Sequence, residues 1–439
     1  MYHPFLNAVR NWHPLEYCGT VTRIASGLVD ADGPMACVGD YCEIEGRNGT
    51  RDVLCEVVSV EPGRIRLSPL HPVSGIGLGA RVRQNDRHVG IPVGDDFAGR
   101  AVNALGEAVD AGPAISADRY AMRDSGAVAM LDRYVHREQL ATGVKAIDAF
   151  IPLATGQRIG IFAASGVGKT SLVEQLSSQI ECDHTILCLI GERGREAEGF
   201  WSNGLSSEVR SRTTLVAATS DESASLRIRA IEQALCLAEF WRGKGRRVVL
   251  FVDSITRLAL ALREIGLASG EPPTVRGYTP NIFAAMPRIV ERCGADRNGG
   301  AITAIFTVLA ETDDLDDPIV ELMKSLLDGH IMLSRDLAER GVFPAIDISA
   351  SISRLASAIL SPAGQCRAES VRRILADFNE VRPMLDSGLY KAGVNHEIDQ
   401  AVRLYPQIRD VLRQPMNENW SLPRTADRID EVLAGVRRL

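Results

Sequence analysis

A glycine-rich segment with one lysine is the part of the sequence that most directly indicates chemistry. This segment, AASGVGKTSL at residues 163–172, follows a strand-like apolar run and opens a helical pattern. Backbone N–H groups in such a turn, together with the positive end of the helix dipole, favour a bound phosphate. Gly166 and Gly168 allow the backbone to approach closely because neither carries a Cβ atom. The pattern predicts a phosphate-binding loop, with Lys169 on the phosphates and the Thr170 hydroxyl on Mg²⁺.

The whole loop is expected to surround the phosphates of a nucleotide. The predicted contact residues are Ala164, Ser165, Gly166, Val167, Gly168, Lys169, Thr170 and Ser171. The loop departs from the general pattern at Ala163, where a first glycine is expected, and alanine is the smallest replacement. A glycine-rich turn between strand and helix that binds no ligand is the alternative interpretation.

Two carboxylates follow other strand-like runs. The run at 248–252 ends in Asp253, where a carboxylate can lie beside Mg²⁺, although capping of a helix is the alternative. The run HTILCLI leads into GERGRE at 191–196, and Glu192 is the candidate to orient or deprotonate an attacking water. A solvated charged cluster is the alternative there. Because the carboxyl ends of parallel strands share an edge, both carboxylates are expected beside the loop.

The surrounding sequence predicts three domains. In residues 1–94, β-branched residues alternate with polar ones between frequent turn residues, which is typical of a small β-barrel or sandwich. In residues 95–361, strand-like and helical runs alternate, which predicts a mostly parallel sheet with helices on both faces. Residues 362–439 have helical periodicity throughout. The expected fold is therefore an α/β core between a β-barrel and a helical domain.

Composition and charge exclude several classes of protein. Of the 439 residues, 45% are hydrophobic and 24% charged, which excludes a fibre, a coiled coil or a disordered chain as the main architecture. The net charge of −7 argues against a surface that coats nucleic acid, although a local basic groove stays open. The nine cysteines form no CxxC pair, and no secretory signal or membrane-length apolar run occurs. We therefore expect a cytoplasmic protein.

Longer motifs carry a family resemblance. The segments GERGRE, DSITRLALALREIGLASGEPP, RGYTPNIFAAMPRIVERCG, LLDGHIMLSRDLAERGVFPAID and SASISR resemble the catalytic subunits of rotary ATPases. The greatest similarity is to the ATPases of bacterial type III protein export, flagellar or injectisome. The resemblance covers nearly the whole chain. It implies an N-terminal β-barrel, a central RecA-like P-loop NTPase domain and a C-terminal helical domain, in a homohexameric ring that binds ATP and Mg²⁺ between subunits.

The same resemblance implies partners and a location. The partners are export-gate proteins, stator-like regulatory proteins and complexes of export chaperones with their substrates. The chain would act as a motor that couples ATP hydrolysis to the unfolding and export of proteins. It would associate peripherally with the cytoplasmic face of the inner membrane, and nucleic acid is not expected as a partner.

Roles for individual residues also follow from the resemblance. Lys169 and Glu192 are similar in position to the catalytic lysine and carboxylate, and Arg193 to a neighbouring residue of the phosphate pocket. Asp253 corresponds to the aspartate on the Mg²⁺ side, which acts through a water molecule. Arg257, one helical turn further on, corresponds to a structural or coupling arginine.

Two further residues of the resemblance lie late in the chain. Phe343 falls where related ATPases place an aromatic ring against adenine, although their usual Tyr-Pro-Ala is Phe-Pro-Ala here; core packing is the alternative. Arg354, after SASIS, is expected to act on a neighbouring subunit's ATP from a small-residue turn at 349–353. An exposed arginine paired with a local carboxylate is the alternative. Residues 197–203 match no motif of the family.

Competing functions are separated by single features of the sequence. A catalytic β-type subunit of a rotary ATP synthase would share the barrel and core, but its acidic DELSEED-like segment is missing, and Glu192 argues against a non-catalytic α-type subunit. A hexameric RNA translocase needs aromatic platforms, whereas residues 20–94 contain Tyr41 alone. The acidic run of Asp313, Asp314, Asp316 and Asp317 is expected to be a solvated loop, with a metal site as the alternative. The motifs leave the flagellar and injectisome branches open, with a slight leaning to the flagellar one.

Overall fold

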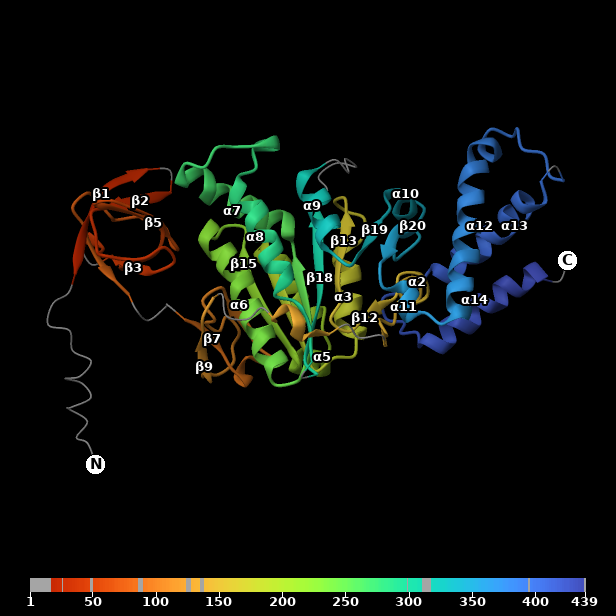
Figure 1. Ribbon diagram of the computed structural model, residues 1–439, viewed down its shortest axis with the longest axis horizontal. Coiled ribbons are helices and arrows are strands. Elements are labelled where there is room, and N and C mark those ends of the chain that lie inside the picture. Colours follow the sequence, from red (N-terminus) through yellow and green to blue (C-terminus); the bar gives the residue numbers. More distant parts are fainter. Residues whose placement is uncertain are drawn as a thin grey trace, which may run out of the picture.

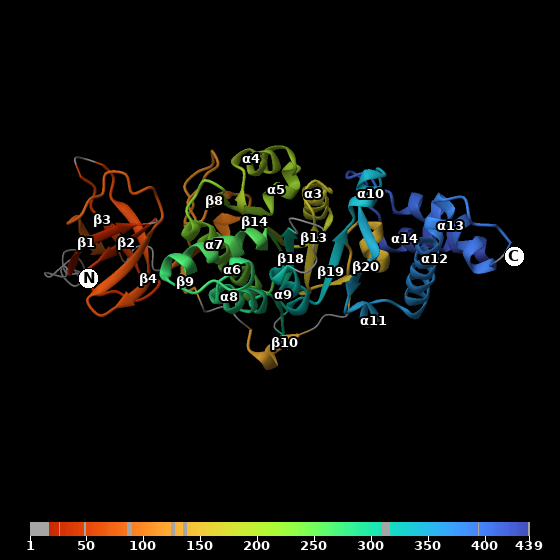
Figure 2. The ribbon, with the colours of Figure 1, turned by 90° about the horizontal axis from the view of Figure 1, so that it is seen from above.

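Three regions follow one another along the long axis of the computed structural model (Figure 1). The structure describes residues 17–25, 27–47, 50–85, 90–123, 128–134, 138–297, 299–309, 317–393 and 395–437. A small barrel lies at one end, an α/β region in the middle and a group of helices at the other end (Figures 1 and 2).

Six strands close the amino-terminal barrel in the order β1-β2-β5-β4-β3-β6. They are β1 (Cys18–Ala25), β2 (Leu28–Ala31), β3 (Tyr41–Ile44), β4 (Val53–Glu61), β5 (Arg64–Pro69) and β6 (Arg81–Gln84). Apolar side chains from alternate positions, among them Val29, Ile44 and Leu67, fill the interior and are fully buried. The β-barrel predicted from the alternation of residue types is confirmed.

One strand of the predicted barrel segment lies elsewhere. β7 (Ile91–Val93) pairs with β9 (Arg119–Ala121) in a separate two-stranded sheet. The Pro92 carbonyl accepts a hydrogen bond of 2.8 Å from Gln233 in α6 (Ala224–Gly243) of the α/β region. Alternation of residue types identifies a strand but not its partner, so the sequence alone did not separate β7 from the barrel.

The central sheet has the strand order β20-β19-β13-β18-β16-β14-β15-β8. Outside this order, β17 pairs with β18, and β10 pairs with β17. Its strands are β8 (Ala101–Asn103), β10 (Arg133–Tyr134), β13 (Arg158–Ala163), β14 (His184–Glu192), β15 (Thr213–Thr219), β16 (Arg247–Asp253), β17 (Gly294–Asp296), β18 (Ala301–Leu309), β19 (Gly329–Leu333) and β20 (Ile346–Ser353). Along the main path all neighbours are parallel except β19 and β20, which are antiparallel.

Helices cover both faces of this sheet, as predicted. They are α2 (Lys145–Phe150), α3 (Lys169–Gln179), α4 (Gly194–Asn203), α5 (Ser207–Ser211), α6, α7 (Ile255–Ser269), α8 (Pro280–Glu291), α9 (Pro318–Leu326) and α10 (Arg335–Glu339). Alternate side chains of β14 enter two different cores: Ile186 packs with α6 to α9, and Leu187 packs with α2 to α5. A buried parallel strand of this kind has no polar face, which explains its continuous apolar run.

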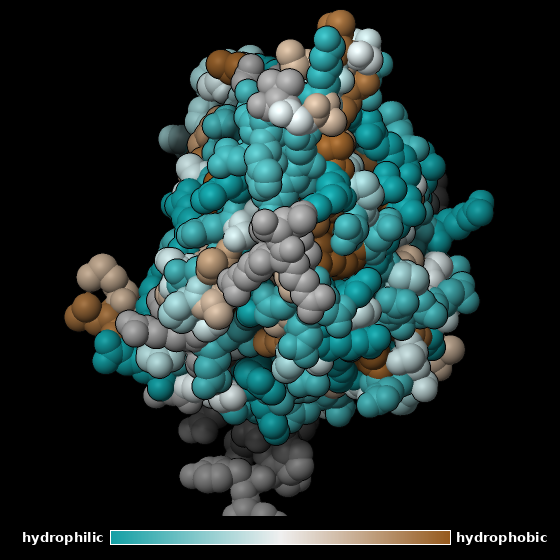
Figure 3. Space-filling model, turned by 90° about the vertical axis from the view of Figure 1, so that its right-hand side faces the viewer, coloured by the Kyte–Doolittle hydropathy of each residue, from teal (hydrophilic) through white to brown (hydrophobic). Residues whose placement is uncertain are grey.

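The carboxyl-terminal region consists of helices α11 (Ala356–Ile359), α12 (Pro362–Asp386), α13 (His396–Leu412) and α14 (Leu422–Arg437). α12, α13 and α14 share the core that contains Phe150 of α2, and Arg372 donates a 2.8 Å hydrogen bond to the Phe150 carbonyl. The end of the molecule that these helices form has a mostly hydrophilic surface (Figure 3). Among the residues that the structure describes, no helix has the length and apolar character needed to cross a membrane.

Candidate active site

The glycine-rich loop connects β13 to α3 at the carboxyl edge of the sheet. Gly166 and Gly168 have φ angles of 80° and 93°, in the left-handed region that favours glycine. Ala163 is the buried last residue of β13, so its methyl group lies in the core and not in the loop. Of the predicted loop residues, Ala164, Val167 and Lys169 are buried, Gly168 is half-buried, and Ser165, Gly166, Thr170 and Ser171 are exposed. The loop is therefore open to solvent at the start of a helix, as phosphate binding requires.

Three charged side chains meet beside this loop. Lys169 contacts the Asp253 carboxylate through its Nζ atom, and the same Nζ lies 3.8 Å from Glu192 Oε1. All three residues are at least 91% buried: Lys169 is the first residue of α3, and Glu192 and Asp253 end β14 and β16. The structure thus brings together the lysine and the two carboxylates that the sequence placed at strand ends.

A threonine that the sequence did not indicate holds Asp253. Thr307 of β18 donates a hydrogen bond from Oγ1 to Asp253 Oδ1 at 2.7 Å, and the same Oγ1 lies 3.3 Å from the Val252 carbonyl oxygen. The register of β16 on β18 pairs Val252 with Phe306, which places Thr307 beside Asp253. The residue carries no signal in the sequence because its role depends on which strands are neighbours.

Arg257, in the first turn of α7, holds Glu192 from the other side. Its Nε lies 3.2 Å from Glu192 Oε1, and its Nη2 donates to Oε2 at 3.2 Å. Its Nη1 also donates to the Gly191 carbonyl. A Cβ atom on Gly191 would lie 3.1 Å from Arg257 Cδ, so glycine leaves room for the arginine. The guanidinium fixes both the carboxylate and the backbone that carries it.

The charges around Glu192 act on its proton affinity in opposite directions. Burial, followed by the repulsion of Asp253, raises the pKa of Glu192 above its ordinary value, whereas Lys169 and Arg257 oppose the rise. A carboxylate with a raised pKa is a stronger base than an ordinary exposed one. The geometry therefore suits Glu192 to accept a proton.

Arg193 is placed differently from Glu192. It is the N-cap residue of α4, and its side chain is 80% exposed, with Nη1 3.9 Å from Glu196 Oε1. Residues 197–203, which matched no motif, complete this helix, and Ala197 and Phe200 bury its inner face. The structure does not bring the Arg193 side chain into the cluster of Lys169, so its part in the phosphate pocket stays a prediction.

Phe343 lies against the loop from the late part of the chain. A Cβ atom built on Gly168 would lie 3.4 Å from two atoms of the Phe343 ring, and the ring is half exposed. The Phe343 carbonyl accepts a hydrogen bond of 2.9 Å from the backbone of Gln414, which follows α13. An aromatic face beside the phosphate loop suits a nucleotide base.

Gln414 in turn belongs to a buried network that sequence reasoning missed. Its Nε2 donates to the Gly143 carbonyl at 2.7 Å. Asp148 holds that loop by accepting hydrogen bonds from Thr142 and from Gly143 N–H. Burial raises the pKa of Asp148 to about 7, against the lowering effect of these hydrogen bonds. Gln414 and Gly143 are 271 positions apart in the sequence, so no local pattern indicates that they meet.

Arg354 lies at the opposite edge of the sheet from the loop. It follows β20, whose last residue, Ser353, pairs with Gly329 at the start of β19. The expected turn at 349–353 is wrong, because these residues form the second half of β20. Their small side chains serve the close pairing of two strands instead, and Ser351 Oγ accepts a hydrogen bond from Met332 N–H at 2.9 Å. Arg354 itself is exposed.

The residues near the loop also fit a magnesium ion. Hydroxyl and carboxylate oxygens are the ligands that Mg²⁺ prefers, and Thr170 and Asp253 supply one of each at the start of α3 and the end of β16.

The acidic run before α9 is described only at its last residue. Asp317 is the N-cap of α9 and pairs with Arg276 at 3.2 Å, while residues 313–316 lie outside the described part of the chain. Within the described part, no cluster of three His, Cys, Asp or Glu side chains suitable for a metal occurs.

Three family models match the chain. The nucleotide-binding domain of the ATP synthase alpha/beta family matches residues 143–353, and the beta-barrel domain of that family matches residues 21–85. The C-terminal domain of the T3SS EscN ATPase matches residues 360–431. Together they cover the barrel, the α/β core and the terminal helices in the predicted order.

Individual relatives are similar over almost their whole length. The chain is 38% identical to the flagellum-specific ATP synthase of Treponema pallidum, covering 94% of this chain and 92% of the relative. It is also 38% identical to the type 3 secretion system ATPase of Xanthomonas euvesicatoria, covering 94% and 93%. The assembled ATPase EscN of the enteropathogenic E. coli type III secretion system superposes with a TM-score of 0.90 at 34% identity, covering 94% of this chain and all of EscN. The chain therefore belongs to the family of flagellum-specific ATP synthases and type 3 secretion system ATPases, as the resemblance of its motifs predicted.

Proposed function

We propose that this chain is the ATP-hydrolysing motor of a bacterial type III protein export apparatus, and that it couples hydrolysis to the unfolding and export of proteins. The observation that carries the proposal is the cluster of Lys169, Glu192 and Asp253 beside an open phosphate loop. A match of residues 360–431 to the C-terminal domain of a secretion ATPase supports export over the β-type subunit of an ATP synthase.

ATP binds, in this proposal, with its phosphates on the loop from Ala164 to Ser171 and its adenine on Phe343. Lys169 lies between two carboxylates in the structure. The phosphates of a bound ATP would attract its ammonium group more strongly than these carboxylates do. The Thr170 hydroxyl and Asp253, through a water molecule, would hold Mg²⁺, whose charge neutralises the β- and γ-phosphates when it is bound.

Glu192 acts as the base of the reaction. It takes a proton from the attacking water as the water oxygen bonds to the γ-phosphorus and the bond to the ADP oxygen breaks. Arg257 holds the carboxylate by both oxygens and so directs it toward the loop. Arg193, which directly follows Glu192 in the chain, is assigned to the rim of the phosphate pocket.

Arg354 completes the site of a neighbouring subunit in a hexameric ring. In its own chain it lies at the sheet edge opposite the loop, so it is available to a second copy. A guanidinium stabilises the charge that develops on the phosphoryl oxygens, an effect worth about 10³–10⁵ in rate. EscN has been solved as an assembled ATPase and in complex with its central stalk EscO. Because this chain is similar to EscN, these structures support the proposal that it also forms a ring.

The remaining parts of the proposal concern domains and partners. Residues 1–94 contain the ring-forming barrel, residues 95–361 form the ATPase domain and residues 362–439 form the helical domain. The ring works at the cytoplasmic face of the inner membrane with export-gate and stator-like regulatory proteins, receives complexes of chaperones with their substrates, and binds no nucleic acid.

Purified protein and an export assay test this function together. Specific activity should rise with protein concentration as rings assemble, because each site then gains its second-subunit arginine. In a strain that lacks the gene for this chain, the wild type should restore export and Glu192→Gln should not. Normal export with the Glu192→Gln chain at equal expression would overturn the motor role.

A further inference from the structure

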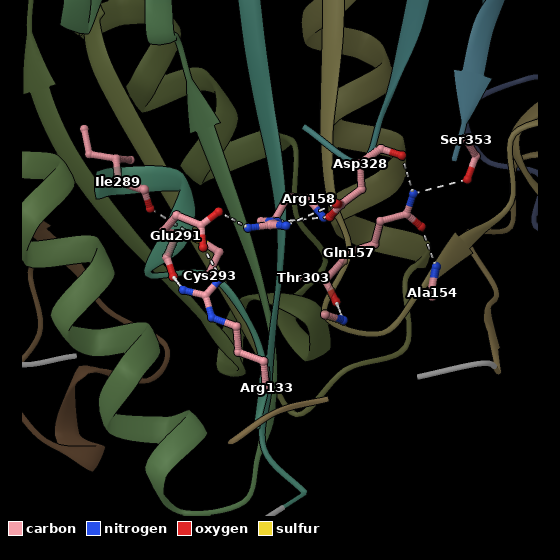
Figure 4. A network of polar contacts seen from close by, with 11 residues as sticks. Arg133, Ala154, Gln157, Arg158, Ile289, Glu291, Cys293, Thr303, Asp328 and Ser353 are labelled. Atoms are coloured by element: carbon pink, nitrogen blue, oxygen red, sulfur yellow. Dashed lines mark hydrogen bonds and ion pairs between the residues drawn. The ribbon is translucent and has the colours of Figure 1, made fainter. Parts of the chain in front are cut away.

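A polar network at the amino edge of the sheet links Arg158 and Asp328 to Ser353, the residue before Arg354 (Figure 4). Arg158, the first residue of β13, donates from Nε and Nη2 to the two carboxylate oxygens of Asp328 at 3.0 and 3.1 Å. Its backbone N–H donates to the same carboxylate at 3.0 Å. Nη1 of Arg158 donates to Glu291 at 2.8 Å, so the guanidinium is fixed at both ends.

Asp328 passes this constraint on to Arg354. Its carbonyl accepts the Arg354 backbone N–H at 2.9 Å. Gln157, which is 1% exposed, donates to Ser353 Oγ at 3.2 Å, and Ser353 Oγ donates to the Pro152 carbonyl at 2.7 Å. Ser353 and the backbone N–H of Arg354 are therefore both held by hydrogen bonds at the amino edge of the sheet.

The neighbouring strands β19 and β20 also lie very close together at Gly329. A Cβ atom on Gly329 would lie 2.4 Å from the Ile352 carbonyl oxygen, so β19 and β20 approach as closely as glycine permits. The Arg354 side chain, by contrast, is exposed, and its Nη2 donates to the Lys324 carbonyl at the end of α9 at 3.1 Å. A fixed base thus carries a side chain that is free to exchange partners.

The strength of the clamp follows from its chemistry. A guanidinium that binds both oxygens of one carboxylate is directional as well as strong, and neither side chain is fully exposed, with 18% for Arg158 and 27% for Asp328. An ammonium or an amide in place of Arg158 cannot reproduce both contacts. Loss of the guanidinium would leave Asp328 held by the Arg158 backbone and by Gln157, so the Arg354 backbone that Asp328 accepts would be positioned less tightly.

We propose that Arg158 is a positioning residue for hydrolysis in the neighbouring subunit: through Asp328 it holds Arg354 at the geometry that the second subunit's ATP requires. This inference rests on the proposed function, in which Arg354 acts across the subunit boundary. The same strand that supplies the phosphate loop at its carboxyl end fixes, at its amino end, the arginine offered to the next copy.

The test is Arg158→Gln in full-length protein. Misplacement of a group by about 1 Å can cost about 10²-fold in rate, so kcat should fall by about 10- to 100-fold. The affinity of the variant for ATP and its ring formation should stay as in the wild type, because its own pocket is intact. Arg133→Gln is the matched control, since Arg133 forms a half-exposed ion pair with Glu291 and does not contact Asp328. The kcat of this variant should stay within about twofold of the wild-type value.

Mixed rings distinguish positioning across the boundary from a local role. Mixed with Lys169→Ala, the Arg158→Gln chains should gain activity, because their intact pockets then receive a well-held Arg354. Mixed with Arg354→Ala they should gain none, because neither chain then offers a working arginine. If Arg158 serves only its own pocket, the pattern reverses, and the proposal is overturned.

A third mixture keeps this inference apart from the function on which it rests. Arg354→Ala mixed with Lys169→Ala should regain activity if the arginine acts across the boundary, and no gain despite proven subunit exchange would reject that action itself. A gain there with the reversed pattern for Arg158→Gln would reject the positioning role alone. If Arg158→Gln chains form no rings, Arg158→Lys, which keeps the charge, takes their place in the same mixtures with the same two outcomes.

Discussion

Replacement of Glu192 by glutamine should separate ATP binding from ATP hydrolysis. The amide has the shape of the carboxylate and can still accept a hydrogen bond from Arg257, which lies 3.2 Å from each carboxylate oxygen. It cannot take a proton from water. The fold and the loop should therefore survive a change that removes the proposed base.

The expected loss of activity is that of an enzyme deprived of its general base. A positioned general base contributes about 10²–10⁴-fold, so kcat should fall by that factor, equivalent to about 3–5 kcal/mol. Binding should respond in the opposite direction. Lys169 is shared between Glu192 at 3.8 Å and Asp253, so the loss of one negative charge leaves the lysine more available to the phosphates. ATP should bind the variant at least as tightly as it binds the wild type.

Phosphate release measures the first effect, and titration with a fluorescent ATP analogue measures the second. Glu196→Gln is the matched control, because Glu196 lies in the first turn of α4, just after Glu192, with a half-exposed side chain that faces Arg193. Its activity should equal that of the wild type. A Glu192→Gln chain with near-normal kcat beside an inactive Glu196→Gln chain would refute the reasoning and move the base to Glu196.

Three other perturbations have definite outcomes. Lys169→Ala should abolish phosphate release and weaken nucleotide binding, whereas Lys244→Ala, on the surface far from the loop, should do neither. Phe343→Ala should raise the KM for ATP by about two- to tenfold and Phe343→Tyr should not, as steady-state kinetics will measure. Since burial raises the pKa of Asp148 from 3.8 to about 7, the folded chain keeps a proton that the unfolded chain releases, so the free energy of unfolding falls as pH rises between these values. Asp148→Asn should remove this part of the slope in thermal melts across that range.

The parts of the molecule that the sequence predicted share one property: each depends on local pattern or on strand direction. The loop at 163–172 has its own residue signature, and the apolar runs before Glu192 and Asp253 mark strands. Because parallel strands end at one edge, the meeting of these two carboxylates with Lys169 could be expected without knowledge of strand order. The barrel and the helical end followed in the same way from periodicity.

The parts that escaped prediction depend on which segments are neighbours. Thr307 holds Asp253 only because β18 lies next to β16, and Gln414 reaches Phe343 only because the terminal helices pack on α2. The run at 349–353 read as a turn because small polar residues are common in turns, whereas here they permit the close approach of β20 to β19. Residue type alone does not distinguish these two uses of a small side chain.

The direction of β20 has a consequence for how a site of this kind is completed. β19 runs parallel to β13 and β20 runs back, so Phe343, just before β20, lies at the loop edge and Arg354, just after it, lies at the other edge. At about 3.3 Å per residue, the eight residues of β20 separate the two by roughly 25 Å, which no side chain spans. If Arg354 serves catalysis, it must therefore serve another copy. Under the proposed function the ring is then a requirement of the sheet's topology, because one chain holds both halves of a site but at opposite edges.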